Sequence, residues 1–189
     1  MQKTYDDLSQ IDSILKKGGV MLCPTNTIWG LSCDAYNKSA VDRIFQIKER
    51  DPTKKLIILV NSIEQLKECV ESIHPRIETL LEFCNRPLTV IYPASPNLPA
   101  YLSTEINTVG IRVTKNQLLI DIIENLGHPL VSTSANKQGV PFPKNFNEIA
   151  PAIIKDVDYT CYAQRNIKNA GRPSLIIRYN EEGELIFLR

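Results

Sequence analysis

The sequence has no apolar run that approaches the roughly 20 residues a membrane-spanning helix needs. Its first seven residues, MQKTYDD, lack the basic and then apolar pattern of a secretory signal peptide. These two absences argue against membrane insertion and against secretion. We therefore expect a cytoplasmic protein with no membrane partner.

Residues typical of metal and covalent chemistry are also scarce. His74 and His128 are the only histidines, and they do not have the spacing of a metal pair. No glycine-rich dinucleotide fingerprint, Walker-type loop or nucleophile elbow is present. The five cysteines lack zinc or redox spacing, so we expect reduced core thiols at Cys23, Cys33, Cys69, Cys84 and Cys161. The sequence thus predicts no protein-held metal, and no serine or cysteine nucleophile has an evident histidine base.

The chain carries little net charge. Its 22 Lys and Arg against 21 Asp and Glu give +1, so no overall field marks a nucleic-acid or membrane protein. With 43% apolar and 23% charged residues, the composition is ordinary for a soluble globular protein. A length of 189 residues fits one domain spanning 1–189.

Apolar periodicity and capping residues predict the helices. A helix with apolar residues from 8 to 15 should stop at Gly18-Gly19, and another, over 40–47, should be capped by Asn37 or Ser39. Capping-box spacing places helix starts near residues 63 and 146. Further helices are expected from Pro75 to about residue 84 and over 117–126.

Strands alternate with these helices. We expect them from about residue 20 and over 56–60, 88–92, 108–113 and 130–132, followed by a hairpin of 174–179 and 184–188. This order predicts an α/β fold, a twisted mixed sheet with helices on both faces. Three segments, 93–104, 137–144 and 164–172, are expected to be long loops, and the last two are candidate lids over a ligand.

Polar side chains cluster where three predicted elements end. Thr25 and Thr27 follow the first strand, Lys48 and Arg50 end a helix, and a cluster follows residue 131. That cluster consists of Ser132, Thr133, Ser134 and Asn136. In open α/β sheets such positions converge on ligand pockets. Each has a simpler explanation, since cations stabilise a helix C-terminus and Ser, Thr and Asn satisfy turn backbone.

Arg112 lies inside the apolar strand predicted over 108–113. A buried guanidinium requires a partner, and the sequence does not distinguish a carboxylate from a ligand anion. Taken alone, the residues indicate an α/β domain that binds an anionic, hydroxyl-bearing small molecule.

Several ordered blocks together resemble one known family. They are PTNTIWGL at 24–31, KER at 48–50, PLTV at 87–90, TVGIRV at 108–113 and SAN at 134–136. In this order and at these intervals the chain resembles the short form of the YrdC-like threonylcarbamoyl-AMP synthases. The resemblance departs from the usual pattern at Asp51, which follows Arg50 directly, and at Trp29 in place of a common tyrosine.

The resemblance implies a YrdC-like domain with a large concave, positively lined cavity. It implies a nucleotidyltransferase that condenses L-threonine, bicarbonate and ATP, with Mg²⁺ on the ATP phosphates, into threonylcarbamoyl-AMP plus pyrophosphate. That product serves N6-threonylcarbamoyladenosine modification at tRNA position 37, so further tRNA-modification proteins would be partners.

The same resemblance assigns roles to individual residues. Lys48 and Arg50 would bind the threonyl carboxylate or the phosphates, and Ser134 and Asn136 the nucleotide. Thr25 would hold threonine with Arg112 close by. The second-rank candidates are Thr27 and Ser132, and Arg189 would face a phosphate.

Two other functions remain as alternatives. One is an RNA-binding or ribosome-maturation factor, although the net charge of +1 favours at most weak binding of double-stranded RNA or tRNA. The other is a YciO-like paralogue that shares the fold but has a different activity.

Overall fold

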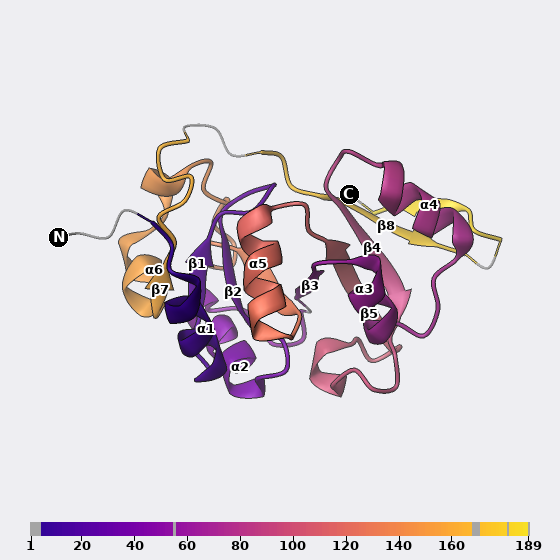
Figure 1. Ribbon diagram of the computed structural model, residues 1–189, viewed down its shortest axis with the longest axis horizontal. Helices are drawn as coiled ribbons and strands as arrows, with labels where there is room; N and C mark the ends of the chain where they lie inside the picture. The colour runs from indigo at the N-terminus through magenta and orange to yellow at the C-terminus, as the bar shows by residue number, and fades with distance from the viewer. Residues whose placement is uncertain (1–4, 55, 168–170, 181, 189) are drawn as a thin grey trace.

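The computed structural model describes residues 5–54, 56–167, 171–180 and 182–188, and within them nine strands form one mixed sheet (Figure 1). The spatial order is β7-β1-β2-β6-β3-β5-β4-β8-β9. The strands are β1 (Met21–Cys23), β2 (Gly30–Asp34), β3 (Ile57–Val60), β4 (Leu88–Pro93), β5 (Thr108–Val113), β6 (Leu130–Ser134), β7 (Tyr159–Thr160), β8 (Leu175–Tyr179) and β9 (Leu185–Phe187). Three neighbouring pairs, β1–β7, β3–β5 and β4–β8, are parallel and the others antiparallel, which confirms the predicted mixed sheet.

Local signals place most helices where the sequence predicts them. The α-helices are α1 (Leu8–Lys16), α2 (Lys38–Lys48), α3 (Ile63–Cys69), α4 (Pro75–Phe83), α5 (Gln117–Leu126) and α6 (Pro151–Asp156), with 3₁₀ turns η1 (Ala100–Leu102) and η2 (Phe146–Glu148). Asn37 caps α2 by accepting from the backbone N–H of Ala40, and Gly18 follows α1 with φ +81°. Among the described helices the longest has 11 residues, so none could span a membrane.

Several elements differ from the sequence prediction, among them α6 and the unpredicted strands β2 and β7. The capping box at Asn145 starts only η2, because Ile149 is extended and Ala150, with φ −57° and ψ 131°, leaves the helical region, as the residue preceding a proline usually does. The helix itself, α6, therefore begins at Pro151. Strand β2 has the sequence GLSCD, which lacks β-branched and aromatic residues, and it forms because it pairs with β1 and β6.

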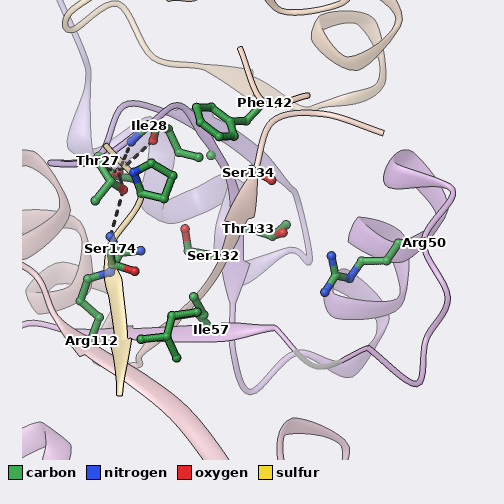
Figure 2. Close-up of a pocket in the computed structure, with 14 residues that line it drawn as sticks. Thr27, Ile28, Arg50, Ile57, Arg112, Ser132, Thr133, Ser134, Phe142 and Ser174 are labelled. Carbon is green, nitrogen blue, oxygen red and sulfur yellow. Dashed lines mark hydrogen bonds between the residues drawn. The ribbon is translucent and has the colours of Figure 1, made fainter. Parts of the chain in front are cut away.

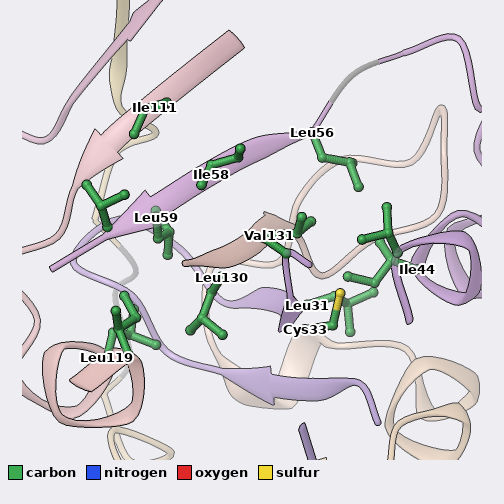
Figure 3. Packing of buried hydrophobic residues seen from close by; sticks show 14 of the residues in the cluster. Leu31, Cys33, Ile44, Leu56, Ile58, Leu59, Ile111, Leu119, Leu130 and Val131 are labelled. Carbon is green, nitrogen blue, oxygen red and sulfur yellow. The ribbon is translucent and has the colours of Figure 1, made fainter. Parts of the chain in front are cut away.

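Side chains that alternate along the strands form two hydrophobic layers, one on each face of the sheet. On one face Ile44 of α2 packs towards Cys33 and Val131, whereas on the other face Leu119 of α5 lies against Leu130 (Figure 3). Leu130 and Val131 are consecutive, so one strand supplies both layers. Each such side chain contributes about 1.5–3 kcal/mol when fully buried. Helices on both faces of the sheet are thus confirmed.

All five cysteines are reduced, and four of them are fully buried. Only Cys84 is partly exposed.

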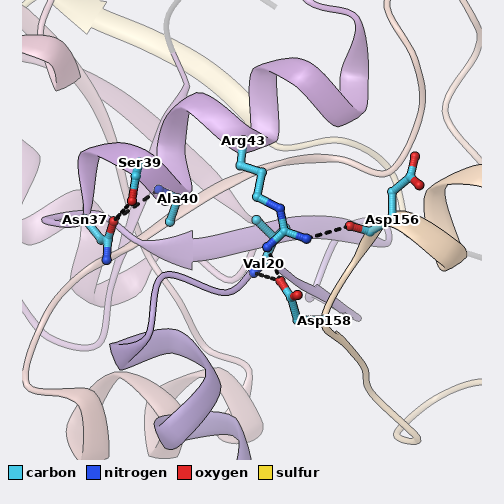
Figure 4. A network of polar contacts seen from close by, with 7 residues as sticks. All are labelled: Val20, Asn37, Ser39, Ala40, Arg43, Asp156 and Asp158. Atoms are coloured by element: carbon cyan, nitrogen blue, oxygen red, sulfur yellow. Dashed lines mark hydrogen bonds and ion pairs between the residues drawn. The ribbon is translucent and has the colours of Figure 1, made fainter.

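A polar network fastens α2 to the β1–β7 edge of the sheet (Figure 4). The carboxylate of Asp158 accepts from the backbone N–H of Val20 at 2.7 Å and from the Arg43 guanidinium at 2.5 Å. Arg43 also donates to the carbonyl of Asp156 at 3.0 Å. Burial opposes ionisation of Asp158, but the bonds from Arg43 and Val20 outweigh it, so the pKa of Asp158 lies below its ordinary value.

Asp158→Asn should lower the free energy of unfolding by about 1 kcal/mol at neutral pH, because Arg43 and the Val20 N–H lose a charged acceptor. Because the pKa of Asp158 is lower in the folded than in the unfolded protein, its carboxylate stabilises the fold at pH values above the unfolded pKa of 3.8. This stabilisation is lost as the pH falls below 3.8 and through the folded pKa. Urea denaturation should therefore show wild type and variant converging in acid. The matched control is Asp42→Asn, which removes the exposed i,i+4 pair with Lys38 and should cost less than about 0.5 kcal/mol. Equal losses in both variants would contradict the assignment.

Candidate functional site

A cavity of about 270 Å³ opens over the end of β6 and the starts of β2 and β3 (Figure 2). Six of the nine residues predicted from the sequence line it, namely Thr25, Thr27, Arg50, Arg112, Ser132 and Ser134. The cavity brings together the strand-end clusters and the arginine that follows α2, so these distant segments do meet.

The β1–β2 loop is held by a chain of hydroxyl groups. The Thr25 hydroxyl donates to the carbonyl of Ile28 at 2.8 Å and accepts from the backbone N–H groups of Thr27 and Ile28. Its oxygen lies 2.7 Å from the Thr27 hydroxyl, which in turn accepts from the Arg112 guanidinium at 3.0 Å. Because the Thr25 hydroxyl donates its proton to the Ile28 carbonyl, the Thr27 hydroxyl is the donor between the two threonines. Each of the two hydroxyls then both donates and accepts a hydrogen bond. The loop and the buried Arg112 are therefore preorganised.

Close backbone contact at β2 makes a side chain at Gly30 a tight fit. A Cβ there would lie 3.0 Å from the carbonyl oxygen of Thr133 and 3.2 Å from the Ser132 hydroxyl. The glycine thus lets the backbone of β2 lie close to the backbone and hydroxyl groups of β6 at the floor of the cavity.

Lys48 lies behind the cavity and does not line it. Its side chain is 1% exposed, and its ammonium donates to the carbonyls of Ser134 and Asn136, the latter at 2.5 Å. Burial and the neighbouring Arg50 lower the pKa of Lys48 to about 8. Lys48 therefore fixes the segment that carries Ser134, rather than the C-terminal carbonyls of its own helix.

Arg50 faces the cavity from the side opposite Thr27 and Arg112 (Figure 2). Glu49 adopts the left-handed conformation, with φ 49°, and the N–H of Arg50 bonds the carbonyl of Phe45, so the chain leaves α2 at once. Burial lowers the pKa of Arg50, and the carboxylate of Asp51 opposes that shift.

The carboxylate of Asp51 is directed into its own turn. It accepts from the backbone N–H of Thr53 at 2.9 Å and from the Thr53 hydroxyl at 2.8 Å, and it is exposed. Asp51 is not among the residues that line the cavity. The departure from the family pattern at this position therefore leaves the cavity without an added negative charge.

Asn136 is the other predicted residue, among those that the structure describes, that does not line the cavity. The Asn136 amide donates to the carbonyls of Lys137 at 3.2 Å and Val140 at 2.5 Å, which shapes the loop that follows β6. Arg189 lies outside the described residues, so its assignment stays a prediction.

Eight lining residues are not in the predicted set. They are Ile28, Gly30, Ile57, Thr133, Phe142, Pro173, Ser174 and Ile176. Four of them lie in segments that the sequence singles out: Thr133 in the polar cluster, Ile28 and Gly30 in the block at 24–31, and Phe142 in the predicted lid loop over 137–144. Ser174 comes from the start of the C-terminal hairpin, where its hydroxyl lies 2.9 Å from that of Thr89. Nothing local in the sequence brings that hairpin to this site.

Comparison with known proteins extends these observations. The model of the Sua5/YciO/YrdC family, described as telomere recombination, matches residues 13–189. A threonylcarbamoyl-AMP synthase of Enterobacter sp. (strain 638) is 32% identical over 145 residues, which cover 75% of this chain and 76% of that protein. A second threonylcarbamoyl-AMP synthase, from Klebsiella pneumoniae, is 35% identical over 132 residues, 68% of this chain and 70% of that protein.

Solved structures share the fold. Sua5 of P. abyssi, crystallised with L-threonine, superposes with a TM-score of 0.82 at 26% identity. The match covers 97% of this chain but 54% of that one, so this chain spans about half the length of Sua5. The sequence match and the shared fold lead to one conclusion: the chain belongs to the Sua5/YciO/YrdC family.

Proposed function

We propose that this enzyme is a threonylcarbamoyl-AMP synthase, a nucleotidyltransferase that condenses L-threonine, bicarbonate and ATP. Its product would supply N6-threonylcarbamoyladenosine at position 37 of tRNA, through tRNA-modification proteins that accept it in the cytoplasm. The observation that carries the proposal is the convergence of Thr25, Thr27, Arg50, Arg112 and Ser134 on one cavity. Relatives that match most of the chain bear this enzyme's name.

The reaction requires positioning and charge neutralisation more than a protein nucleophile. The threonine amine and bicarbonate give a carbamate with loss of water, and a carbamate oxygen then attacks the α-phosphorus of ATP. Pyrophosphate leaves, and threonylcarbamoyl-AMP remains. Because the carbamate, the threonine carboxylate and the triphosphate are all anionic, the protein must offer cations and hydrogen-bond donors.

The cavity lining suits these anions. Arg50 and Arg112 approach it from opposite sides, and the described lining includes hydroxyls but no Asp or Glu. We assign the preorganised Thr25–Thr27–Arg112 side to threonine and the Ser132 and Ser134 hydroxyls to the nucleotide. Arg50 then neutralises charge on the phosphates. Since the described lining offers no carboxylate ligand, Mg²⁺ would enter with ATP, held by its phosphates and by water.

Lys48 has a supporting role in this assignment. Its ammonium holds the carbonyls of Ser134 and Asn136 and so positions the hydroxyl of Ser134 at the cavity wall. Binding of tRNA or double-stranded RNA would be weak, because a net charge of +1 gives little counterion release.

The purified protein should release pyrophosphate from ATP only when both L-threonine and bicarbonate are present, because their carbamate is the nucleophile. Omitting each substrate in turn provides the control. Threonine should be preferred over serine by ~1–3 kcal/mol, the effect of one methyl group in an apolar contact. Turnover of ATP that does not depend on threonine would refute the proposed reaction.

Arg50→Ala should lower kcat/KM at least tenfold, on the order of 1.4 kcal/mol of transition-state stabilisation, with an unchanged Tm. The control is Lys54→Ala, which removes an exposed cation nearby but keeps the carbonyl that Arg50 contacts at 3.4 Å. Steady-state kinetics and thermal melts of both variants distinguish a substrate contact from a general charge effect. Equal losses in the two variants would remove Arg50 from the site.

Wild type should gain stability relative to Lys48→Met as the pH rises from about 8 to 10.5. The folded pKa of Lys48 is about 8 and the ordinary value is 10.5, so between them the unfolded chain binds more protons and a higher pH favours folding. The full difference corresponds to about 3 kcal/mol. Urea denaturation of both proteins at pH 7 and pH 10 measures it. A constant difference between the two curves would mean that Lys48 titrates normally.

A further inference from the structure

A stack of three rings and one guanidinium lies behind the wall of the cavity. The ring of Trp29 lies 5.0 Å from that of Phe146, centre to centre. The guanidinium carbon of Arg165 lies 4.8 Å from the centre of the Phe146 ring and 4.3 Å from that of Tyr162. Arg165 therefore sits between the rings of Phe146 and Tyr162, and Phe146 in turn contacts Trp29. None of the substrate assignments above uses this stack.

Arg165 is anchored to the edge of the sheet. Its Nε donates to the carbonyl of Cys161 and its Nη2 to that of Thr160, both at 2.6 Å. The adjoining backbone is fixed as well, because the N–H groups of Tyr162 and Ala163 donate to the carboxylate of Asp6. The base of the stack is thus a rigid segment that continues from β7.

The other end of the stack lies next to residues that line the cavity, since Trp29 stands between Ile28 and Gly30, which both line it. Trp29 is 4% exposed and stands two residues after Thr27, in the loop proposed to hold threonine. Phe146 follows Phe142, which lines the cavity, by four residues. A smaller hollow beside the main cavity is lined by Thr25, Thr27 and Ile28 together with Trp29 and Lys144. The stack therefore joins the threonine loop to η2, which follows the lid loop, and joins both to the β7 edge.

We propose that Arg165 is a positioning residue for substrate binding, which acts by holding Phe146 and Trp29 in place. Without its guanidinium, Phe146 loses a cation over its face and the two loops lose their shared attachment. Thr25 and Phe142 then sample positions in which they do not contact the substrate together. Because these contacts exist before and during reaction, the main effect falls on KM and not on kcat. The identity of the substrate as threonine rests on the proposed function, whereas the role of Arg165 in holding Phe146 against Trp29 does not depend on it.

The test compares Arg165→Met with Arg43→Met, a matched control. Arg43 is also a half-exposed arginine that donates to a backbone carbonyl near the same edge, but it touches no ring of the stack. Trp29 is the single tryptophan, so its fluorescence reports on the stack in the folded protein without any assay of activity. Arg165→Met should shift the emission to longer wavelength and raise acrylamide quenching about twofold, and the KM for L-threonine should rise roughly tenfold with kcat within about threefold. Arg43→Met should lower Tm and leave both readouts unchanged.

Phe146→Leu provides a second variant, which breaks the link to Trp29 while Arg165 keeps its two carbonyls. It should change fluorescence and KM in the same direction. Unchanged Trp29 emission in Arg165→Met would show that the guanidinium does not hold the stack. A changed emission with wild-type KM, or an equal rise of KM in Arg43→Met, would also overturn the proposal. If wild type released no pyrophosphate, the proposed function would fail, and threonine affinity measured by calorimetry would replace KM in the same comparison.

Discussion

The pairing of β6 with both of its neighbours is the constraint on which the rest of the structure depends. Its register with β2 sets Ser134 opposite Gly30, and its register with β3 sets Ser132 opposite Ile57. Because side chains alternate along a strand, the same register also sends Leu130 to one hydrophobic layer and Val131 to the other. A shift by one residue would exchange the two faces of β6, so that Leu130 would leave its hydrophobic layer and Ser132 would leave the cavity. The packing of the core and the lining of the cavity are therefore selected together.

The positively charged side chains at the site differ in their burial. Arg50 and Arg112 reach the cavity, whereas Lys48 is buried beneath it against carbonyl oxygens. Burial and the neighbouring Arg50 lower the pKa of Lys48 to about 8, so its ammonium is partly deprotonated near that pH. The positive potential at the cavity thus comes mainly from guanidinium groups, which stay charged and can contact phosphate or carboxylate with two donors.

Local signals in the sequence predicted local structure well. The helix over 117–126 and the cap at Asn37 depend on neighbours within one turn, and both are confirmed. Strand β2 escaped prediction because its residues have little intrinsic preference and gain their conformation from partners far along the chain. The same holds at the site. The pattern located Lys48 at a helix end, but its orientation depends on carbonyls 86 and 88 residues away. The strand-end pattern supplied most of the candidate residues and the family resemblance supplied their roles, whereas the burial of each side chain came only from the fold.

The wide separation of the lining residues along the chain has a consequence for folding. Contributions come from the β1–β2 loop, β3, β5, β6 and the start of β8, so no part of the chain forms the cavity by itself. A partly folded chain would have no affinity for the ligand, and closing these long-range contacts makes the topology slow to assemble. A ligand bound to the finished cavity stabilises the entire cooperative unit by mass action, and does not merely tighten the loops that touch it.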